Sequence, residues 1–420
     1  MGAGEHIDDA APPQYEIRAT SFGGRGVFAL RPIPKDTLVL ACAAPYARVV
    51  LRKFKREVCG WCFAYSFESG KNKWSIRLDD PRKKDSGGNG DGSAGTWFCM
   101  DECRESWARS YHFGKDDDLG WWMTVNAALE KIVTQAKKRK VSRDRNLSSN
   151  SGASPMLALL DNLKEGDVTR EAISHGWKVA EEVFSEETKS GTSSWGVEAM
   201  SEFELDTVRF VLDGLITRAT QEVSPSTSSA ATAGVWDDLL ALQDNEYALI
   251  RSKPHMLASQ IRIYGFIKRS VQLARSEWKA KAAGVGYESA FQVLWRLVST
   301  SETVRAILAR DHGNAFGIWD TAPDEEESEM LGWGLYVSGS YFNHNCSPNL
   351  KKHRHKRGIN FYTTRDVNAD EELCISYIDV CPGASVIDRK AGLESDWFFV
   401  CQCARCVRES NVGMDLCIRD

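Results

Sequence analysis

The sequence predicts an α+β protein in which β-rich parts near the two ends of the chain flank a long helical part. Short apolar runs broken by glycine and proline occupy 15–51 and return from 315 to 377, a pattern typical of strands joined by turns. Between them, from 119 to 299, apolar residues recur at helical spacing. Closely spaced cysteines mark a third kind of segment, with the spacing of metal ligands.

The composition is that of a globular protein with room for more than one domain. The chain has 420 residues, of which 42% are hydrophobic and 26% charged. A net charge of −5 provides no overall basic field, so nucleic acid is not expected as the main partner. No apolar run approaches the roughly 20 residues of a membrane span, and the N-terminus lacks an apolar signal core. We therefore expect no membrane association and a location in the nucleus, the cytoplasm or both.

The helical middle is poor in motifs. Helices are expected over 203–216 and 256–273, and Leu129 and Val133 belong to one apolar face of an earlier helix. Stretches rich in glycine, serine, threonine or alanine are predicted to be loops or linkers, at 85–95, 148–154 and 224–233.

The most informative segment runs from Tyr341 to Asn349 and reads YFNHNCSPN. Alone, its asparagine and proline residues would fit a polar turn. Downstream, however, Glu371 to Tyr377 (EELCISY) ends an apolar run with a tyrosine, and a short tail holds Cys401, Cys403 and Cys406. Upstream, GRGVFA begins at Gly24. The four elements together need a common explanation.

These elements resemble, in the same order, the N-terminal motif, the two signature motifs and the post-SET cysteines of SET-domain protein-lysine methyltransferases. The resemblance implies a β-rich SET fold with a pseudoknot, an inserted zinc finger, a long helical insert and a zinc-binding post-SET tail. It covers roughly the first and last quarters of the chain. It also implies S-adenosylmethionine as cofactor and a protein substrate with a target lysine, either a histone or another protein, bound by a monomeric enzyme.

A cysteine segment between the two SET portions is similar to the zinc finger of the SET-and-MYND subfamily. Cys59 and Cys62 form one pair, and Cys99 and Cys103 form another. Four thiolates suffice for one tetrahedral structural zinc. The second ligand set of a complete MYND finger is missing, so we expect a degenerate finger with one zinc. Two buried thiol turns without metal are the alternative.

The resemblance implies a second zinc bound by Cys346, Cys401, Cys403 and Cys406. The three tail cysteines need a fourth donor to complete a tetrahedron, and Cys346 of the signature motif would supply it. Such a zinc would pin the tail onto the SET core. About two structural zinc ions per chain are therefore expected. Cys42 and Cys374 are interpreted as ordinary core cysteines within apolar strands.

The cofactor and the lysine are assigned through the same resemblance. It implies that the cofactor contacts the residues Arg25, Gly26, Asn314, Asn343, His344, Tyr377 and Phe399. Trp397 and Phe399 match aromatics that line the lysine channel. Tyr377 matches the catalytic tyrosine, whose hydroxyl would orient the amine and the methyl group. A structural tyrosine at a strand end is the alternative for Tyr377.

The resemblance also divides the chain. The segments are a disordered N-terminus (1–14), an N-terminal SET portion (15–56), a MYND-like finger (57–113), a helical insert (114–298), a C-terminal SET portion (299–380) and a post-SET tail (381–420). The chain departs from the subfamily by a longer insert and by lacking the C-terminal helical-repeat domain. Asp370 stands where the family usually has glycine, at a turn that aspartate tolerates.

Two alternatives remain from the sequence. One is a non-catalytic SET and zinc-finger adaptor that binds other proteins. The other concerns the basic run Lys351 to Arg357, expected in a hairpin, which is either a solvated surface or a site for acidic partners, phosphate or nuclear import factors.

Overall fold

Two compact units make up the chain, one formed by Met1–Cys42 with Gly339–Asp420 and the other by Ala43–Ser338. The computed structural model describes residues 13–20, 24–78, 95–110, 120–145, 168–190, 200–223, 233–281, 290–320, 328–380 and 384–417. The predicted linker at 148–154 lies outside these residues. So do most of the predicted disordered N-terminus, of the loop at 85–95 and of the linker at 224–233.

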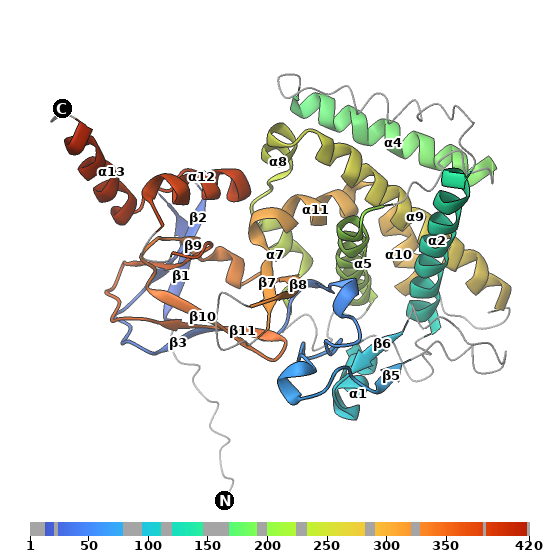
Figure 1. Ribbon diagram of the computed structural model, residues 1–420, viewed down its shortest axis with the longest axis horizontal. Helices are drawn as coiled ribbons and strands as arrows, with labels where there is room; N and C mark the ends of the chain where they lie inside the picture. The colour runs from blue at the N-terminus through green and yellow to red at the C-terminus, as the bar shows by residue number, and fades with distance from the viewer. Residues whose placement is uncertain are drawn as a thin grey trace, which may run out of the picture. The chain divides into compact units, whose positions relative to one another are not determined.

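The first unit contains two small sheets followed by two helices (Figure 1). Its elements are β1 (Tyr15–Ala19), β2 (Arg25–Ala29), β3 (Leu38–Cys42), η6 (Gly339–Tyr341), β9 (Asn343–His344), β10 (Leu350–His355), β11 (Gly358–Thr363), β12 (Glu372–Ile375), α12 (Val386–Trp397) and α13 (Ala404–Cys417). One sheet has the order β1-β2-β12-β9 and the other β10-β11-β3. Strands from both ends of the sequence therefore share each sheet.

Local sequence explains the turns of this unit. Lys356, with φ of 54°, lies between β10 and β11, which pair antiparallel from Leu350–Thr363 to His355–Gly358. The basic run thus lies in a hairpin, as predicted. Asp370 has φ of 64° just before β12, which is the left-handed conformation that glycine adopts most readily. The substitution of glycine by aspartate at this turn is therefore tolerated at a small cost in backbone strain.

The second unit is mostly helical (Figure 1). Its elements are β4 (Ala47–Val50), η1 (Arg52–Phe54), η2 (Phe67–Ser69), β5 (Ile76–Leu78), β6 (Thr96–Phe98), α1 (Asp101–Ser110), α2 (Gly120–Arg145), α4 (Arg170–Ser190), α5 (Glu202–Val223), α7 (Trp236–Ala241), α8 (Glu246–Ser252), α9 (His255–Lys281), α10 (Ala290–Ser299), α11 (Glu302–Asn314), β7 (Phe316–Trp319) and β8 (Met330–Leu335). β8 lies between β4 and β7 in a three-stranded sheet, and β5 pairs with β6.

Helix α5 forms the centre of this unit. It packs against α9, α10, α11 and the strand β4, and most of its residues from Glu204 to Thr220 are buried. The buried carboxylate of Glu204 accepts hydrogen bonds from Arg262 at 2.5 Å and from Ser259 at 2.8 Å, both on α9. A buried charge is costly unless it is paired in this way. The predicted helices at 203–216 and 256–273 are confirmed, and both extend beyond the predicted ends.

This mixture of small sheets and helices confirms the α+β class. No helix within the described residues is both long and apolar enough to cross a membrane. The boundaries of the six predicted segments stay predictions. Each compact unit contains parts of several segments, so the two units do not test those boundaries.

Asp311, a buried carboxyl on α11, makes a test of stability possible. Burial raises its pKa to about 7, whereas an unfolded aspartate titrates near about 4. Between these values the folded chain holds a proton that the unfolded chain has released, so stability falls as pH rises through this window. Asp311→Asn should therefore stabilise the protein more at pH 8 than at pH 5. Urea unfolding of the wild type and of Asp311→Asn at both pH values measures the free energy of unfolding. The same pH dependence of that free energy in both proteins would contradict the expectation.

Candidate active site and zinc centres

The two signature segments of the first unit are held together by a parallel strand pair. β9 pairs with β12 so that Asn343 faces Cys374 and His344 faces Ile375. Asn345 then donates its backbone N–H to the Ile375 carbonyl at 2.9 Å. Residues about thirty positions apart thus become neighbours, and Tyr377 follows directly after the paired strand. The resulting cluster is the candidate active site.

Asn343 ties this strand pair to the N-terminal motif. Its side-chain amide donates to the Arg25 carbonyl at 3.0 Å and to Glu372 Oε1 at 2.8 Å. Gly26 lies against the same amide, since a Cβ there would come within 2.9 Å of Asn343 Nδ2 and 2.3 Å of Glu372 Oε1. Three of the chain's motifs therefore meet at one amide group. Arg25 itself places its guanidinium 5.1 Å from the centre of the Tyr341 ring.

A methyl group at position 26 should disturb this arrangement. Because Asn343 is fixed by two hydrogen bonds, Gly26→Ala is expected to displace its amide and to weaken S-adenosylmethionine binding by about 10-fold, or about 1.4 kcal/mol. Isothermal titration calorimetry measures the change. Gly392→Ala is the control, because no atom beyond its chain neighbours and the backbone of its own helix lies within 4 Å of the position that its Cβ would take. Equal affinities of Gly26→Ala and wild type would contradict the predicted contact of Gly26 with the cofactor.

Both ring nitrogens of His344 are engaged. Nδ1 accepts the backbone N–H of Tyr377 at 3.0 Å, and Nε2 lies 3.2 Å from Cys346 Sγ. Burial, together with the charge of Arg389, lowers the pKa of His344 to about 4, so the ring is neutral near pH 7. An accepting Nδ1 places the proton of a neutral imidazole on Nε2. His344 therefore donates toward Cys346 while it orients the backbone of Tyr377.

Tyr377 lies at the centre of an aromatic group. Its hydroxyl donates to the Phe342 carbonyl at 2.8 Å, and burial, with Cys374 and Glu372 nearby, raises its pKa, which keeps the hydroxyl protonated. The centres of the rings of Trp397 and Phe399 lie 5.9 and 6.2 Å from the centre of the Tyr377 ring. Phe398 between them has φ of 63°, so the chain turns sharply where α12 ends. This turn brings both aromatics to Tyr377.

The tail cysteines meet Cys346 in a buried cluster. The four sulfur atoms of Cys346, Cys401, Cys403 and Cys406 all lie within 4.8 Å of one another. Cys346 Sγ is 3.9 Å from Cys401 Sγ and 3.5 Å from Cys406 Sγ. A tetrahedral zinc with Zn–S bonds of about 2.3 Å requires sulfurs about 3.8 Å apart. The predicted set of four ligands is therefore brought together with the spacing that zinc needs.

The thiols of this cluster need a cation in order to ionise. Burial, followed by hydrogen bonding with Cys406, raises the pKa of Cys346 to about 11, because a thiolate is poorly solvated in an apolar place. A bound divalent cation compensates that charge and lets the thiols ionise. The same cluster packs against Leu393, Trp397, Phe399 and Tyr377. The metal site and the aromatic group thus belong to one core.

A second cluster occupies the second unit. The sulfurs of Cys59, Cys62, Cys99 and Cys103 also lie within 4.8 Å of one another. Cys99 Sγ lies 3.5 Å from Cys62 Sγ and 3.6 Å from Cys103 Sγ. The first pair follows η1, Cys99 follows β6, and Cys103 lies in the first turn of α1. These four residues could bind one zinc, as the spacing of the two pairs predicts.

Asn314 lies in the second unit, at the end of α11. Its amide donates to the carbonyls of Gln243 and Arg310, both at 3.0 Å. Gly313 before it has φ of 86°, so this is a helix end stabilised by the asparagine. Its role toward the cofactor stays a prediction.

Two residues of the signature segments have structural roles that the sequence analysis did not assign. Asn349 accepts the Cys374 N–H and donates to the Glu372 carbonyl, both at 2.8 Å, and so holds the end of β10 to β12. Glu372 receives the amide of Asn343. Both lie in motifs that the sequence displays, but only the strand pairing reveals which backbone groups they satisfy.

Comparison with known proteins agrees with this geometry. The family described as "SET domain" matches residues 24–378, from the N-terminal motif to the residue after Tyr377. The chain belongs to the SET-domain family. It is 26% identical over 412 residues to a protein of Saccharomyces cerevisiae named potential protein lysine methyltransferase SET6. The match covers 94% of this chain and 96% of that protein.

Other relatives of this SET-domain protein match over shorter stretches. A histone-lysine N-methyltransferase SET5 of Eremothecium gossypii is 37% identical over 75 residues, which is 18% of this chain and 15% of that protein. The protein-lysine N-trimethyltransferase SMYD5 of Gallus gallus is 34% identical over 94 residues, 21% of this chain and 22% of that protein. The similarity to proteins of the SET-and-MYND type is thus partial in extent.

Proposed function

We propose that this chain is an S-adenosylmethionine-dependent protein-lysine N-methyltransferase. The observation that carries the proposal is the parallel pairing of β9 with β12, which joins Asn343 and His344 to the strand that precedes Tyr377. Membership of the SET-domain family and the names of the relatives support the same activity. The adaptor alternative is not favoured, because the family match and the relatives named as lysine methyltransferases support an enzyme.

The residues named from the resemblance form the proposed cofactor site. Gly26 and Arg25 would provide one wall, and Asn343 would fix that wall through its bonds to Arg25 and Glu372. His344 would act through the backbone that it orients, since its ring nitrogens face Tyr377 and Cys346. Phe399 would contribute an aromatic face. When bound, S-adenosylmethionine supplies a methyl group that a lysine amine can attack.

The aromatic group is the proposed lysine channel. Trp397, Phe399 and Tyr377 present rings that attract an ammonium through cation–π interaction and exclude water from the amine. Loss of water disfavours the charged form of lysine, so the ammonium would pass its proton to solvent water as it enters the channel, and the neutral amine is then the nucleophile. The Tyr377 hydroxyl, held by the Phe342 carbonyl, would then orient the reacting groups.

Both cysteine clusters are proposed to hold one structural zinc each, the second of them in a degenerate, single-zinc MYND-like finger. The purified protein should therefore contain close to two zinc ions per chain, measured by plasma emission spectrometry. A value near zero or near three would contradict the assignment. Exchange against cobalt would distinguish thiolate sites from surface binding, because four-thiolate cobalt sites absorb in the visible range.

Substrate, location and assembly remain proposals from the same resemblance. We propose a protein substrate with a target lysine, bound by a monomer in the nucleus or cytoplasm. The test is incubation with S-adenosylmethionine labelled in the methyl group, once with purified histones and once with a cell extract, followed by mass spectrometry of labelled lysines. Asn343→Ala is the control for background. No label above that control in either reaction, together with no calorimetric binding of the cofactor, would overturn the proposal.

A further inference from the structure

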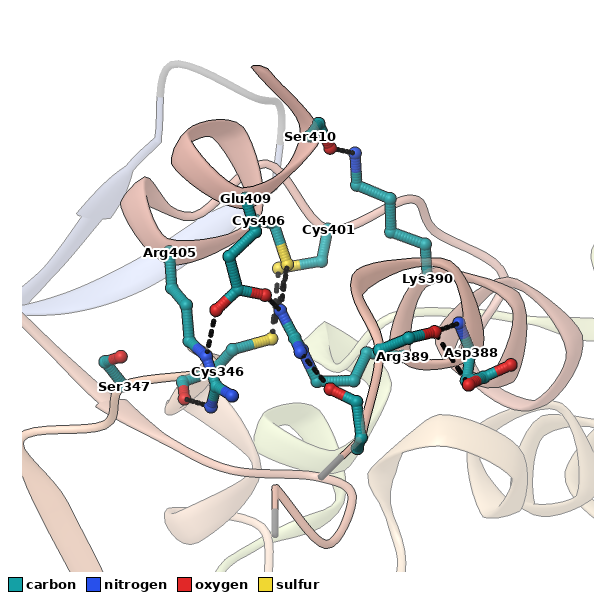
Figure 2. Close-up of polar contacts among 12 residues, drawn as sticks. Cys346, Ser347, Asp388, Arg389, Lys390, Cys401, Arg405, Cys406, Glu409 and Ser410 are labelled. Atoms are coloured by element: carbon teal, nitrogen blue, oxygen red, sulfur yellow. Dashed lines mark hydrogen bonds and ion pairs between the residues drawn. The ribbon is translucent and has the colours of Figure 1, made fainter. Parts of the chain in front are cut away.

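Arg389 is a fully buried cation beside the tail cysteines. It lies on α12, and its side chain is 1% exposed. Figure 2 shows its guanidinium between the cysteine sulfurs and the carboxylate of Glu409. It donates to Glu409 Oε2 and to the Ala384 carbonyl, both at 2.5 Å, and to Cys406 Sγ at 3.7 Å. A cation removed from water needs negative partners, and one of them here is a cysteine sulfur.

The cysteine cluster carries the charge that Arg389 would balance. Four thiolates around one Zn²⁺ leave a net charge of −2, and three of the four cysteines are buried. Such a charge in an apolar core is unfavourable unless hydrogen-bond donors or cations face the sulfurs. Within the described residues, the side chain of Arg389 faces Cys406 and His344 Nε2 faces Cys346, while backbone groups of Cys346, Cys403 and Cys406 face the sulfurs of Cys401 and Cys403. Among these donors Arg389 brings a guanidinium, which stays charged in proteins.

Glu409 fixes the direction of Arg389. Its carboxylate also accepts from Arg405 Nε at 2.8 Å, and Arg405 Nη1 donates to the Cys346 carbonyl at 3.1 Å. Both arginines thus approach the ligand residues, one at a sulfur and one at a backbone oxygen (Figure 2). The same nitrogen of Arg389, Nη2, donates to Glu409 Oε2 and to Cys406 Sγ, so the carboxylate fixes the group that faces the sulfur.

We propose that Arg389 is a positioning residue for the tail zinc: its charge balances the four thiolates, its hydrogen bond holds Cys406, and Glu409 keeps it aimed at that sulfur. The inference rests on the proposed zinc site. It adds that the affinity of this site depends on a residue outside the set of ligands. A second possibility is that Arg389 serves only to join α12 to α13 through Glu409.

Lys390 provides a matched control for that second possibility. It follows Arg389 on α12 and donates to Ser410 Oγ on α13 at 3.0 Å. It therefore joins the same two helices. Within the described residues, Lys390 makes no hydrogen bond to a cysteine. Glu409→Gln is a further comparison, because it weakens the ion pair but leaves the guanidinium beside Cys406.

The experiment measures zinc release from the whole protein to a chromogenic chelator, together with alkylation of individual cysteines by N-ethylmaleimide read by mass spectrometry. Arg389→Gln should accelerate zinc loss and alkylation at Cys401, Cys403 and Cys406 by about 10- to 100-fold, the usual effect of a lost partner of a metal ligand. Arg389→Lys, which keeps the charge, should lie between Arg389→Gln and wild type. Lys390→Gln should resemble wild type, and Glu409→Gln should have a smaller effect than Arg389→Gln.

The finger cysteines serve as an internal standard for folding. Cys59 and Cys103 should react at the wild-type rate in all variants. If Arg389→Gln exposes them too, that variant has lost its fold. The inference is then tested by comparing zinc loss and alkylation at the tail in Arg389→Lys with those in Lys390→Gln. Wild-type rates at the tail in both Arg389 variants, or equal effects of Arg389→Gln and Glu409→Gln, would overturn the inference. A wild-type protein with zinc only at the finger would overturn the tail zinc site itself.

Discussion

Tyr377→Phe should lower the rate of methyl transfer by about 10- to 1000-fold, the range for loss of one preorganised polar group. The ring and its packing against Trp397 and Phe399 are retained in this variant. Cofactor affinity should therefore change little, because the hydroxyl would act mainly as the reaction proceeds. The measurement is turnover on the substrate that the labelling experiment identifies, beside calorimetric titration with S-adenosylmethionine.

Stability must be measured on the same samples, because the hydroxyl also satisfies the Phe342 carbonyl. Its removal should cost about 1–3 kcal/mol, as for other buried groups that lose a partner. Proteins with about 5–15 kcal/mol of stability remain folded after such a loss, so unfolding alone cannot produce the expected fall in turnover. Unchanged turnover with a lowered melting temperature would make Tyr377 structural and remove it from the mechanism.

Cys403→Ser should have the second large effect. It removes one of the four sulfurs that surround the tail site, and a neutral hydroxyl is a poor ligand for zinc beside thiolates. We expect the zinc content to fall from about two ions to about one, and activity to fall more than 10-fold. The reason is that Phe399 and Trp397 lie immediately before these ligands and pack against Tyr377 in the same core.

Cys417→Ser is the control for this substitution, since Cys417 belongs to neither group of closely spaced cysteines in the sequence. It should keep two zinc ions and wild-type turnover. Retention of two zinc ions by Cys403→Ser would remove Cys403 from the ligands. Loss of zinc with full activity would instead separate the tail site from catalysis.

The sequence predicted the cysteine clusters well because ligand spacing is a local property. Cys59 with Cys62, and Cys401 with Cys403 and Cys406, lie within a few positions of one another, as tight turns around a metal require. Cys346 as the fourth ligand came from the family resemblance. The paired cysteines of the finger and of the tail lie together in space as expected.

Partners far apart in sequence were not predictable in the same way. Arg389 and Glu409 lie twenty positions apart, and neither is part of a recognisable motif. In a sequence with many charged residues, nothing marks one arginine as buried beside sulfur atoms. The role of Asn343 as a clamp on Arg25 likewise depends on β2, β9 and β12 meeting in one sheet. Long-range pairing, and not local pattern, decides such contacts.

The proposed tail zinc has a consequence for the unfolded chain. Its ligands Cys346 and Cys401 are 55 positions apart, and β10, β11 and β12 lie between them. Closing a loop of this span costs the unfolded chain about 4 kcal/mol of conformational entropy in the chain-entropy description. Zinc binding, which is coupled to folding, would offset that cost. When a chelator removes zinc, those strands should pair more slowly. Refolding should therefore be slower without zinc than with it.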